Sequence, residues 1–203
     1  MILYGASGHG KVIIEILESI GAPHIEIWDD EERPAVWDHT VKLPPARGVT
    51  VDNELIVSIG NNATRKSVAE RVGAQVKFGT AVHAAAHVSR RAQVGMGTVV
   101  MAGAVVNADV SIGRHCIINT SASIDHDCVI GDYAHISPNA TLSGDVHVGQ
   151  GTHVGAGAVA IQGVRIGKWC TIGAGSVVIG DIPDHATAVG NPARVIKINE
   201  QKK

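Results

Sequence analysis

A six-residue repeat runs without a break from Val82 to Val178, and it is the feature that most limits how this chain can fold. Every sixth residue is aliphatic or alanine, and the residue four places after each is mostly small. The small residue and the next aliphatic residue are two apart, so in a strand both point to the same side, into a core. Three repeats, about 18 residues, would close a triangular coil whose neighbours pair as parallel strands about 4.8 Å apart. The repeat therefore predicts a mainly β fold, a parallel β-helix.

The composition agrees with such a narrow core. Aromatic residues make up only 3% of the 203 residues, whereas 45% are apolar, so the core must be built from small aliphatic side chains. The three cysteines, Cys116, Cys128 and Cys170, fall on the small inward position of the repeat and show no CxxC spacing. We interpret them as buried packing residues rather than as disulfide partners, zinc ligands or nucleophiles.

Charge and hydropathy exclude some partners. The net charge of −2 provides no broad field that would attract nucleic acid or acidic membranes. No segment reaches the roughly 20 apolar residues of a membrane span. We therefore expect a cytoplasmic protein without nucleic-acid or membrane partners.

The N-terminal part follows a different pattern. Apolar spacing predicts strands at residues 2–4, 25–28 and 55–59, a short fourth strand at 75–78, and helices at 11–20 and 63–72, with a loop over 31–49. Alternating strands and helices predict a small parallel sheet with a nucleotide-type crevice at the carboxyl ends of its strands. We expect a Rossmann-like domain over residues 1–79 and the β-helix over residues 80–203.

A glycine-rich turn, GASGHG at residues 5–10, lies between the first strand and the first helix. Its glycines do not follow the dinucleotide fingerprint, but Asp29 lies nineteen positions beyond Gly10, and Asp30 follows it. Backbone N–H groups at a helix start can hold phosphates, and a carboxylate can accept hydrogen bonds from a ribose or base. A domain of this size suits one nucleotide. The alternative is a tight turn beside a solvated acidic loop.

His126 is distinct among the eleven histidines. It lies at a corner two residues after Ile124, and either neighbouring carboxylate, Asp125 or Asp127, could orient its ring and stabilise its protonated form. Gly144 lies eighteen residues on, one coil above. A missing side chain there leaves room for a substrate and exposes a backbone N–H that could serve as an oxyanion donor. His135 is expected to lie beneath His153 on one face.

Taken together, the hexapeptides, the stretch NTSASIDHDCVIGDYAHI (119–136) and the tail AVGNPARVI (188–196) resemble the hexapeptide-repeat acyltransferases. The similarity covers essentially the whole chain and is to the nucleotide-sugar N-acetyltransferase branch, which includes the UDP-4-amino-sugar acetyltransferases of bacillosamine synthesis and the sialic-acid O-acetyltransferase-like proteins. This resemblance implies a left-handed β-helix and a homotrimer with acetyl-CoA between adjacent prisms. It also implies direct acetyl transfer, without a metal, to the 4-amino group of a nucleotide-linked, UDP-type 4-amino-4,6-dideoxy sugar in bacterial glycan synthesis.

The resemblance also assigns roles to residues. His126 would be the general base, and Asp127, where the family member has a longer Glu, would raise its basicity. The Gly144 N–H would face the thioester oxygen. Acetyl-CoA contacts would come from His135, Ala156 and Ala174. Contacts to the nucleotide sugar would come from Ser7, Gly8, His9, Asp29, Asp30, Gly60, Asn61 and Asn119.

Several alternatives stay open at this point. Within the same chemistry, the acceptor could be GDP-perosamine or a sialic-acid-type hydroxyl. A γ-carbonic-anhydrase-like metal site requires histidines five residues apart with a third two coils away, and no two histidines here are five or 36 apart. A β-helix without catalytic activity is the other alternative, against which the glycine-rich turn and the tail motif both argue.

Overall fold

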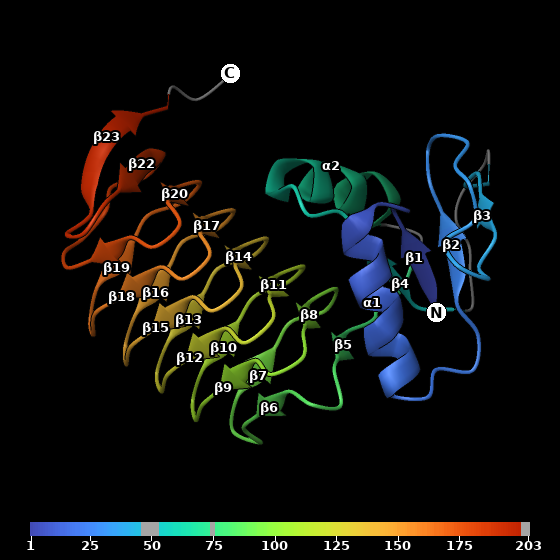
Figure 1. Cartoon of the computed structure of the whole chain (residues 1–203), viewed down its shortest axis with the longest axis horizontal. Helices are drawn as coiled ribbons and strands as arrows, with labels where there is room; N and C mark the ends of the chain where they lie inside the picture. The colour runs from blue at the N-terminus through green and yellow to red at the C-terminus, as the bar shows by residue number, and fades with distance from the viewer. Residues whose placement is uncertain (46–52, 74–75, 200–203) are drawn as a thin grey trace.

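The computed structural model describes residues 1–45, 53–73 and 76–199. It has two parts, a small α/β domain at the N-terminus and a long β-helix whose coils advance away from that domain (Figure 1). The structure is thus the predicted left-handed parallel β-helix preceded by a Rossmann-like domain.

The N-terminal domain is a four-stranded sheet with the strand order β3-β2-β1-β4. Its strands are all parallel and short, namely β1 (Ile2–Tyr4), β2 (Glu26–Trp28), β3 (Val41–Lys42) and β4 (Leu55–Val57). The two helices are α1 (Gly8–Ser19), after β1, and α2 (Asn62–Val72), after β4. Both helices therefore begin at the carboxyl ends of the two adjacent strands β1 and β4, on the side of the sheet where nucleotide ligands bind in such folds.

Two predicted elements in this domain were wrong. The fourth strand is β3, inside the segment predicted to be a loop, because a two-residue strand is too short to show any alternation. In the predicted strand at 75–78, Phe78 forms one isolated bridge to Leu55, and Gln75 lies outside the described residues, as do 46–49 of the loop. Helix α1 begins at Gly8 rather than at residue 11.

The early start of α1 has a steric reason. A Cβ on Gly10 would lie 2.7 Å from the carbonyl oxygen of Gly5, so the helix can pack against the end of β1 only if this residue is glycine. The turn predicted over residues 5–10 therefore becomes partly the first turn of the helix.

Seventeen two-residue strands form the β-helix, and they fall into three parallel sheets. Sheet I contains β5 (Ala81–Val82), β8 (Val99–Val100), β11 (Ile117–Ile118), β14 (His135–Ile136), β17 (His153–Val154) and β20 (Thr171–Ile172), and is extended by β22 (Ala186–Val189) and β23 (Arg194–Ile198). Sheet II contains β6 (His87–Val88), β9 (Val105–Val106), β12 (Ser123–Ile124), β15 (Thr141–Leu142), β18 (Val159–Ala160) and β21 (Val177–Val178). Sheet III contains β7 (Gln93–Val94), β10 (Ser111–Ile112), β13 (Val129–Ile130), β16 (His147–Val148) and β19 (Arg165–Ile166).

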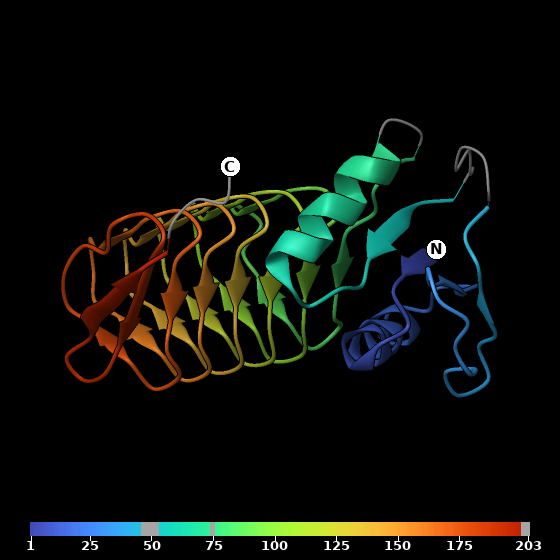
Figure 2. The ribbon, with the colours of Figure 1, turned by 90° about the horizontal axis from the view of Figure 1, so that it is seen from above.

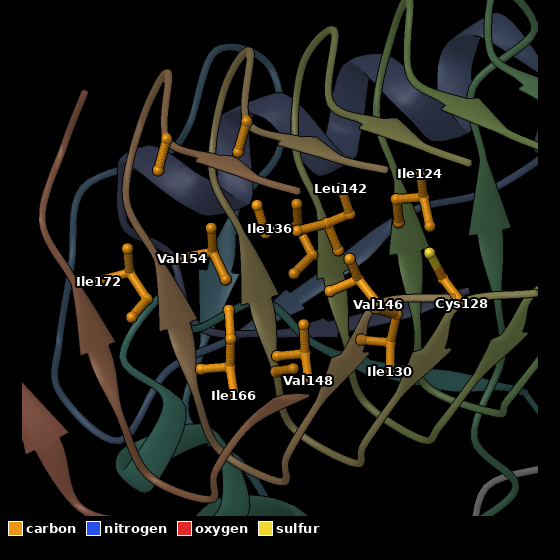
Figure 3. Packing of buried hydrophobic residues seen from close by; sticks show 14 of the residues in the cluster. Ile124, Cys128, Ile130, Ile136, Leu142, Val146, Val148, Val154, Ile166 and Ile172 are labelled. Carbon is orange, nitrogen blue, oxygen red and sulfur yellow. The ribbon is translucent and has the colours of Figure 1, made fainter. Parts of the chain in front are cut away.

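The register confirms the 18-residue coil, since Ser111 pairs with Val129 and Ile112 with Ile130. Aliphatic residues at the repeat positions point inward and fill the prism in stacked layers (Figure 3). All three cysteines are buried in this core, as predicted. The repeat thus gives a stiff column in which each corner residue lies directly above its counterpart one coil earlier.

The N-terminal domain covers sheet I near the first coils, with α2 running alongside the prism (Figure 2). Val99 and Ile117 point outward from sheet I, yet they are only 2% and 1% exposed because they pack in one apolar cluster with α1 residues such as Ile13 and Leu17. In a triangular prism, the edge between the other two sheets is the one farthest from this covered face. Residues on that edge are therefore separated from the N-terminal domain by the width of the prism.

Candidate active site

His126 lies in the corner between sheets II and III, directly after β12. Its Nδ1 is 2.7 Å from Oδ2 of Asp127, and the His126 side chain is 61% exposed. Asp125 has a different function, because its Oδ1 accepts hydrogen bonds from the backbone N–H of His126 (2.8 Å) and from Nδ2 of Asn107 (2.9 Å). Of the two carboxylates considered from the sequence, Asp127 therefore contacts the ring and Asp125 fixes the backbone.

Electrostatics at this corner favour a basic imidazole. The hydrogen bond to Asp127, followed by the charge of Asp125, raises the pKa of His126 above its ordinary value. Its Nε2 makes no hydrogen bond to any described residue, and the side chain is exposed. The ring is thus held at Nδ1 and free to accept a proton at Nε2.

Gly144 lies directly above the His126 ring. A Cβ at Gly144 would be 2.6 Å from Cε1 and 2.8 Å from Nε2 of His126, so the ring can keep this position only if residue 144 is glycine. Within the described part of the chain, the Gly144 N–H donates no hydrogen bond. A proton acceptor and an unused amide donor therefore lie side by side at one exposed corner.

Cys128, two residues after His126, is buried and donates a hydrogen bond to the carbonyl oxygen of Ser143 at 3.2 Å. Burial raises the pKa of its thiol to about 11. A protonated, inward-pointing thiol is a poor nucleophile, which agrees with the prediction that this cysteine only packs.

The predicted nucleotide-type crevice would lie at the starts of the two helices. A Cβ on Gly8 or on Gly60 would meet no atom within 4 Å, so the backbone there is open to a ligand. Ser7 precedes α1 as its N-cap residue but makes no side-chain capping hydrogen bond. Asn61 caps α2 by accepting from the N–H of Thr64 at 2.9 Å. Two helix N-termini with open backbone can hold phosphate groups.

The two predicted acidic residues are already engaged within the domain. Oδ2 of Asp29 accepts from the N–H of Ala6 at 2.8 Å and so fixes the glycine-rich turn. Asp30 accepts from the Tyr4 hydroxyl at 2.5 Å and from Arg71 at 2.7 Å. The hydrogen bond from Arg71 holds the pKa of Asp30 below its ordinary value. The Tyr4 and Arg71 partners were not predicted.

Two stacked histidines, His135 and His153, lie on the strands β14 and β17 of sheet I. The rings of His135 and His153 are 4.7 Å apart with an interplanar angle of 9°. Nε2 of His135 is 2.9 Å from Nδ2 of Asn119, and Nε2 of His153 is 2.7 Å from the Ser137 hydroxyl. Burial, followed by the charge of His153, lowers the pKa of His135 to about 3, so its ring is neutral at neutral pH. The predicted stack is confirmed.

The histidine stack and α2 share a cavity of about 510 Å³. Gly60 and Asn61 line it from the α2 side, and His135, His153 and Trp169 line it from the β-helix. The structure thus brings together residues that the resemblance assigned to the nucleotide sugar and one that it assigned to acetyl-CoA.

Ala156 and Ala174 lie one above the other in corners between sheets I and II. Within the described residues, neither backbone N–H donates a hydrogen bond, so both are available to a ligand. These corners border sheet II on one side, and the corner of His126 borders it on the other.

The structure does not bring all predicted site residues together in one chain. His126 lies on the edge opposite sheet I, whereas the glycine-rich turn, Gly60 and His135 all lie on the side of sheet I. The prism itself separates the two groups. The sequence analysis did not predict this separation. It also did not predict that Asn107 contacts Asp125, although Asn107 lies eighteen residues before Asp125 and therefore one coil below it.

The described residues contain neither a group of metal ligands nor a membrane-spanning helix. Across residues 1–45, 53–73 and 76–199, no three His, Cys, Asp or Glu side chains are grouped as metal ligands. In the same ranges, no helix has the length and apolar character needed to span a bilayer.

Comparison with protein families matched both parts of the chain. A model described as the PglD N-terminal domain matches residues 1–72. The bacterial transferase hexapeptide model, which spans six repeats, matches residues 109–144 and 145–180. A comparison with curated protein sequences gave no match.

Solved structures extend this similarity to the whole chain. The acetyltransferase domain of PglB from Neisseria gonorrhoeae is 36% identical, with a TM-score of 0.92 over 96% of this chain and 98% of that one, and it has also been solved with acetyl coenzyme A. Perosamine N-acetyltransferase from Caulobacter crescentus, solved as a histidine mutant with CoA and GDP-perosamine, is 35% identical, with a TM-score of 0.90 over 97% and 96%. WeeI from Acinetobacter baumannii, at 24% identity and a TM-score of 0.71, shares the fold. The chain therefore belongs to the hexapeptide-repeat nucleotide-sugar N-acetyltransferases, a family of acetyl-CoA-dependent sugar acetyltransferases.

Proposed function

We propose that this protein transfers the acetyl group of acetyl-CoA to the 4-amino group of a UDP-linked 4-amino-4,6-dideoxy sugar, in bacterial glycan synthesis. The observation that carries the proposal is the corner where His126 is bonded to Asp127 at 2.7 Å and covered by Gly144. An oriented base beside an unused amide donor suits acyl transfer to an amine.

The transfer is direct. The sugar nitrogen attacks the acetyl carbonyl carbon while His126 Nε2 takes a proton from that nitrogen. The carbonyl oxygen becomes an oxyanion that accepts a hydrogen bond from the Gly144 N–H. The C–S bond then breaks, the proton on His126 passes to the departing CoA thiolate, and the amide is released. Because Cys128 is buried and protonated, no acyl-enzyme on that thiol takes part.

The two substrates are assigned to two groups of residues. The Ala156 and Ala174 amides and His135 would hold acetyl-CoA, whereas the crevice formed by Ser7, Gly8 and the Gly60–Asn61 segment would hold the nucleotide sugar. Asp29, Asp30, His9 and Asn119 complete the proposed sugar-nucleotide contacts. The bound acetyl coenzyme A of the PglB domain and the GDP-perosamine of the perosamine enzyme support these two ligand classes.

A homotrimer would complete this site. When three prisms meet with sheet II toward a common axis, the corner of His126 in one chain adjoins the corner of Ala156 and Ala174 in the next. Five of the six outward residues of sheet II suit such packing because they are small or β-branched, namely Val105, Ser123, Thr141, Val159 and Val177. The sixth is His87, in the first coil. The base of one chain would then act on the nucleotide sugar held by its neighbour.

The nucleotide is tested by measuring CoA release with UDP- and GDP-linked 4-amino-4,6-dideoxy sugars side by side. GDP is the second candidate because the perosamine enzyme, 35% identical to this chain, was solved with GDP-perosamine. We expect kcat/KM to be at least about tenfold higher with the UDP sugar, since one lost base contact costs on the order of 1–3 kcal/mol. A preference for the GDP sugar would replace the first proposal with the second, and turnover of neither would reject both.

Asp127 gives a prediction about pH. Because its hydrogen bond raises the pKa of His126, the wild-type rate should fall as the pH drops below that raised value and the base becomes protonated. In Asp127→Asn the pKa of His126 falls, so the acidic limb of log kcat/KM against pH should move to lower pH. The plateau should also fall, because a weaker base takes the proton less readily.

The matched control for that profile is Asp145→Asn, which removes a carboxylate from the equivalent corner one coil later, where Asp145 is bonded to His147 at 3.2 Å. This variant should move the acidic limb much less than Asp127→Asn does, because the charge of Asp145 is the smallest of the contributions that raise the pKa of His126. If Asp127→Asn leaves the limb in place, the rate does not depend on the ionisation of His126.

A further inference from the structure

Arg65 lies on the buried face of α2. The buried residues of this helix follow helical spacing, at Asn62, Arg65, Val68, Ala69 and Val72. Only 1% of Arg65 is exposed, so a charged side chain occupies a position where the pattern calls for an apolar one. Burying a cation is costly unless all its donors find acceptors, which makes its contacts informative.

The Arg65 guanidinium makes five hydrogen bonds that connect the two parts of the molecule. Nε donates to the carbonyl oxygen of His115 (2.8 Å), and Nη2 donates to that of Tyr133 (2.9 Å), both in β-helix corners. Nη1 donates to the carbonyl oxygens of Ile59 (2.9 Å) and Gly60 (3.0 Å). The fifth bond, from Nη2 to Oδ1 of Asn62 (2.9 Å), continues from Nδ2 of Asn62 to the carbonyl oxygen of Gly151 (3.0 Å).

These bonds fix the segment that lines the proposed nucleotide-sugar crevice. Gly60 and Asn61 border the cavity, and Arg65 holds the carbonyl groups of Ile59 and Gly60 against two successive coils. The planar fork of arginine satisfies several fixed acceptors at once, which the single ammonium of a lysine cannot do. The position of this segment relative to sheet I therefore depends on one side chain.

Arg65 also leaves a positive charge without a carboxylate partner among the described residues. Its charge adds to burial in lowering the pKa of His9 to about 4, and it contributes to the lowered pKa of His135, which lines the cavity. A buried cation without a carboxylate partner, beside histidines that burial keeps neutral, is complemented by an anionic ligand.

We propose that Arg65 is a positioning residue for the nucleotide-sugar site, which holds the Gly60–Asn61 segment against the β-helix and supplies fixed positive charge for the ligand's diphosphate. This inference rests on the proposed function, because it assigns Arg65 to the nucleotide sugar and not to acetyl-CoA. It predicts a selective effect on one of the two substrates.

The test compares Arg65→Lys and Arg65→Met in the full-length protein, with direct UDP and GDP binding measured by calorimetry alongside the kinetics. In Arg65→Met we expect the KM for the nucleotide sugar and the Kd for its nucleoside diphosphate to rise at least about tenfold, because the Gly60–Asn61 segment loses its anchor and the site loses its fixed positive charge. The KM for acetyl-CoA should change by less than about twofold. Arg65→Lys, which keeps the charge but not the fork, should lie between wild type and Arg65→Met.

The matched control is Lys66→Met, which removes a charge from the next residue of α2, where Lys66 is paired with Glu70 at 2.6 Å. Its KM values should stay near those of the wild type. An equal rise in both KM values, or unchanged diphosphate binding in a folded Arg65→Lys protein, would overturn the positioning function. If Arg65→Met fails to fold, the KM values and the diphosphate binding of Arg65→Lys alone test the proposal. Wild-type protein that binds neither UDP nor GDP would instead reject the proposed function.

Discussion

Replacing His126 by alanine should lower kcat/KM for the sugar acceptor by about 10²–10⁴-fold, the usual contribution of a positioned general base. The side chain is exposed, so the fold should be unaffected. The KM for acetyl-CoA should change little, because its proposed contacts lie at a different corner. The measurement is the initial rate of CoA release at saturating acetyl-CoA, at a pH above the raised pKa of His126.

The control for this variant is His147→Ala. His147 is also bonded to a carboxylate, Asp145 at 3.2 Å, but it lies on sheet III without a glycine above its ring. Its loss should leave the rate within about twofold of wild type. A His126→Ala protein that retains most of its rate would show that another group takes the proton.

Mixing two inactive chains tests whether neighbouring chains share the site. Gly8→Leu fits the fold, since a Cβ at Gly8 meets nothing within 4 Å, but it would fill the crevice and should be inactive alone. If His126 acts on a substrate held by the next chain, trimers reassembled from equal amounts of His126→Ala and Gly8→Leu chains should regain about a quarter of the wild-type rate. No recovery after reassembly would place both functions in one chain.

Gly144→Ala should be nearly as damaging as loss of the histidine. The new Cβ would lie 2.6 Å from Cε1 of His126, so the exposed ring must move away from the Gly144 N–H and from its bond to Asp127. Misplacing the base and obstructing the oxyanion donor should lower kcat by about 10²-fold or more. Because the ring can move into solvent, the free energy of unfolding should change by only about 0.5 kcal/mol.

Gly180→Ala is the matched control, because Gly180 occupies the same corner position two coils further on, where a Cβ meets nothing within 4 Å. Its rate and stability should both match the wild type. A Gly144→Ala enzyme with a wild-type rate would mean that the space above His126 is not where the thioester lies.

Sequence periodicity predicted the β-helix well, because every six-residue unit has the same inward positions. Each unit therefore indicates its own inward residues without reference to the units before it. The phase alone placed the cysteines inside and Gly144 above His126. Prediction was weaker in the N-terminal domain. There β3 has only two residues, and the start of α1 depends on the contact of Gly10 with Gly5, which no local pattern encodes.

The site was predicted in parts, and its assembly was not. Spacing identified the His126 corner, but it could not assign Asp127 to the ring and Asp125 to the backbone, since that division depends on the turn of the chain at the corner. Arg65 was missed because four of its five partners are backbone carbonyl groups, as far as 68 residues away, and such partners leave no trace in the sequence. The placement of His126 opposite the covered sheet required the packing of one domain on the other.

The most direct test of the central claim is product analysis after incubation of the wild-type protein with acetyl-CoA and a UDP-linked 4-amino-4,6-dideoxy sugar. Mass spectrometry should show one acetyl group added at the sugar nitrogen for each CoA released, and His126→Ala should form almost none of this product. Release of CoA without an acetylated sugar, or equal product from His126→Ala, would contradict the account.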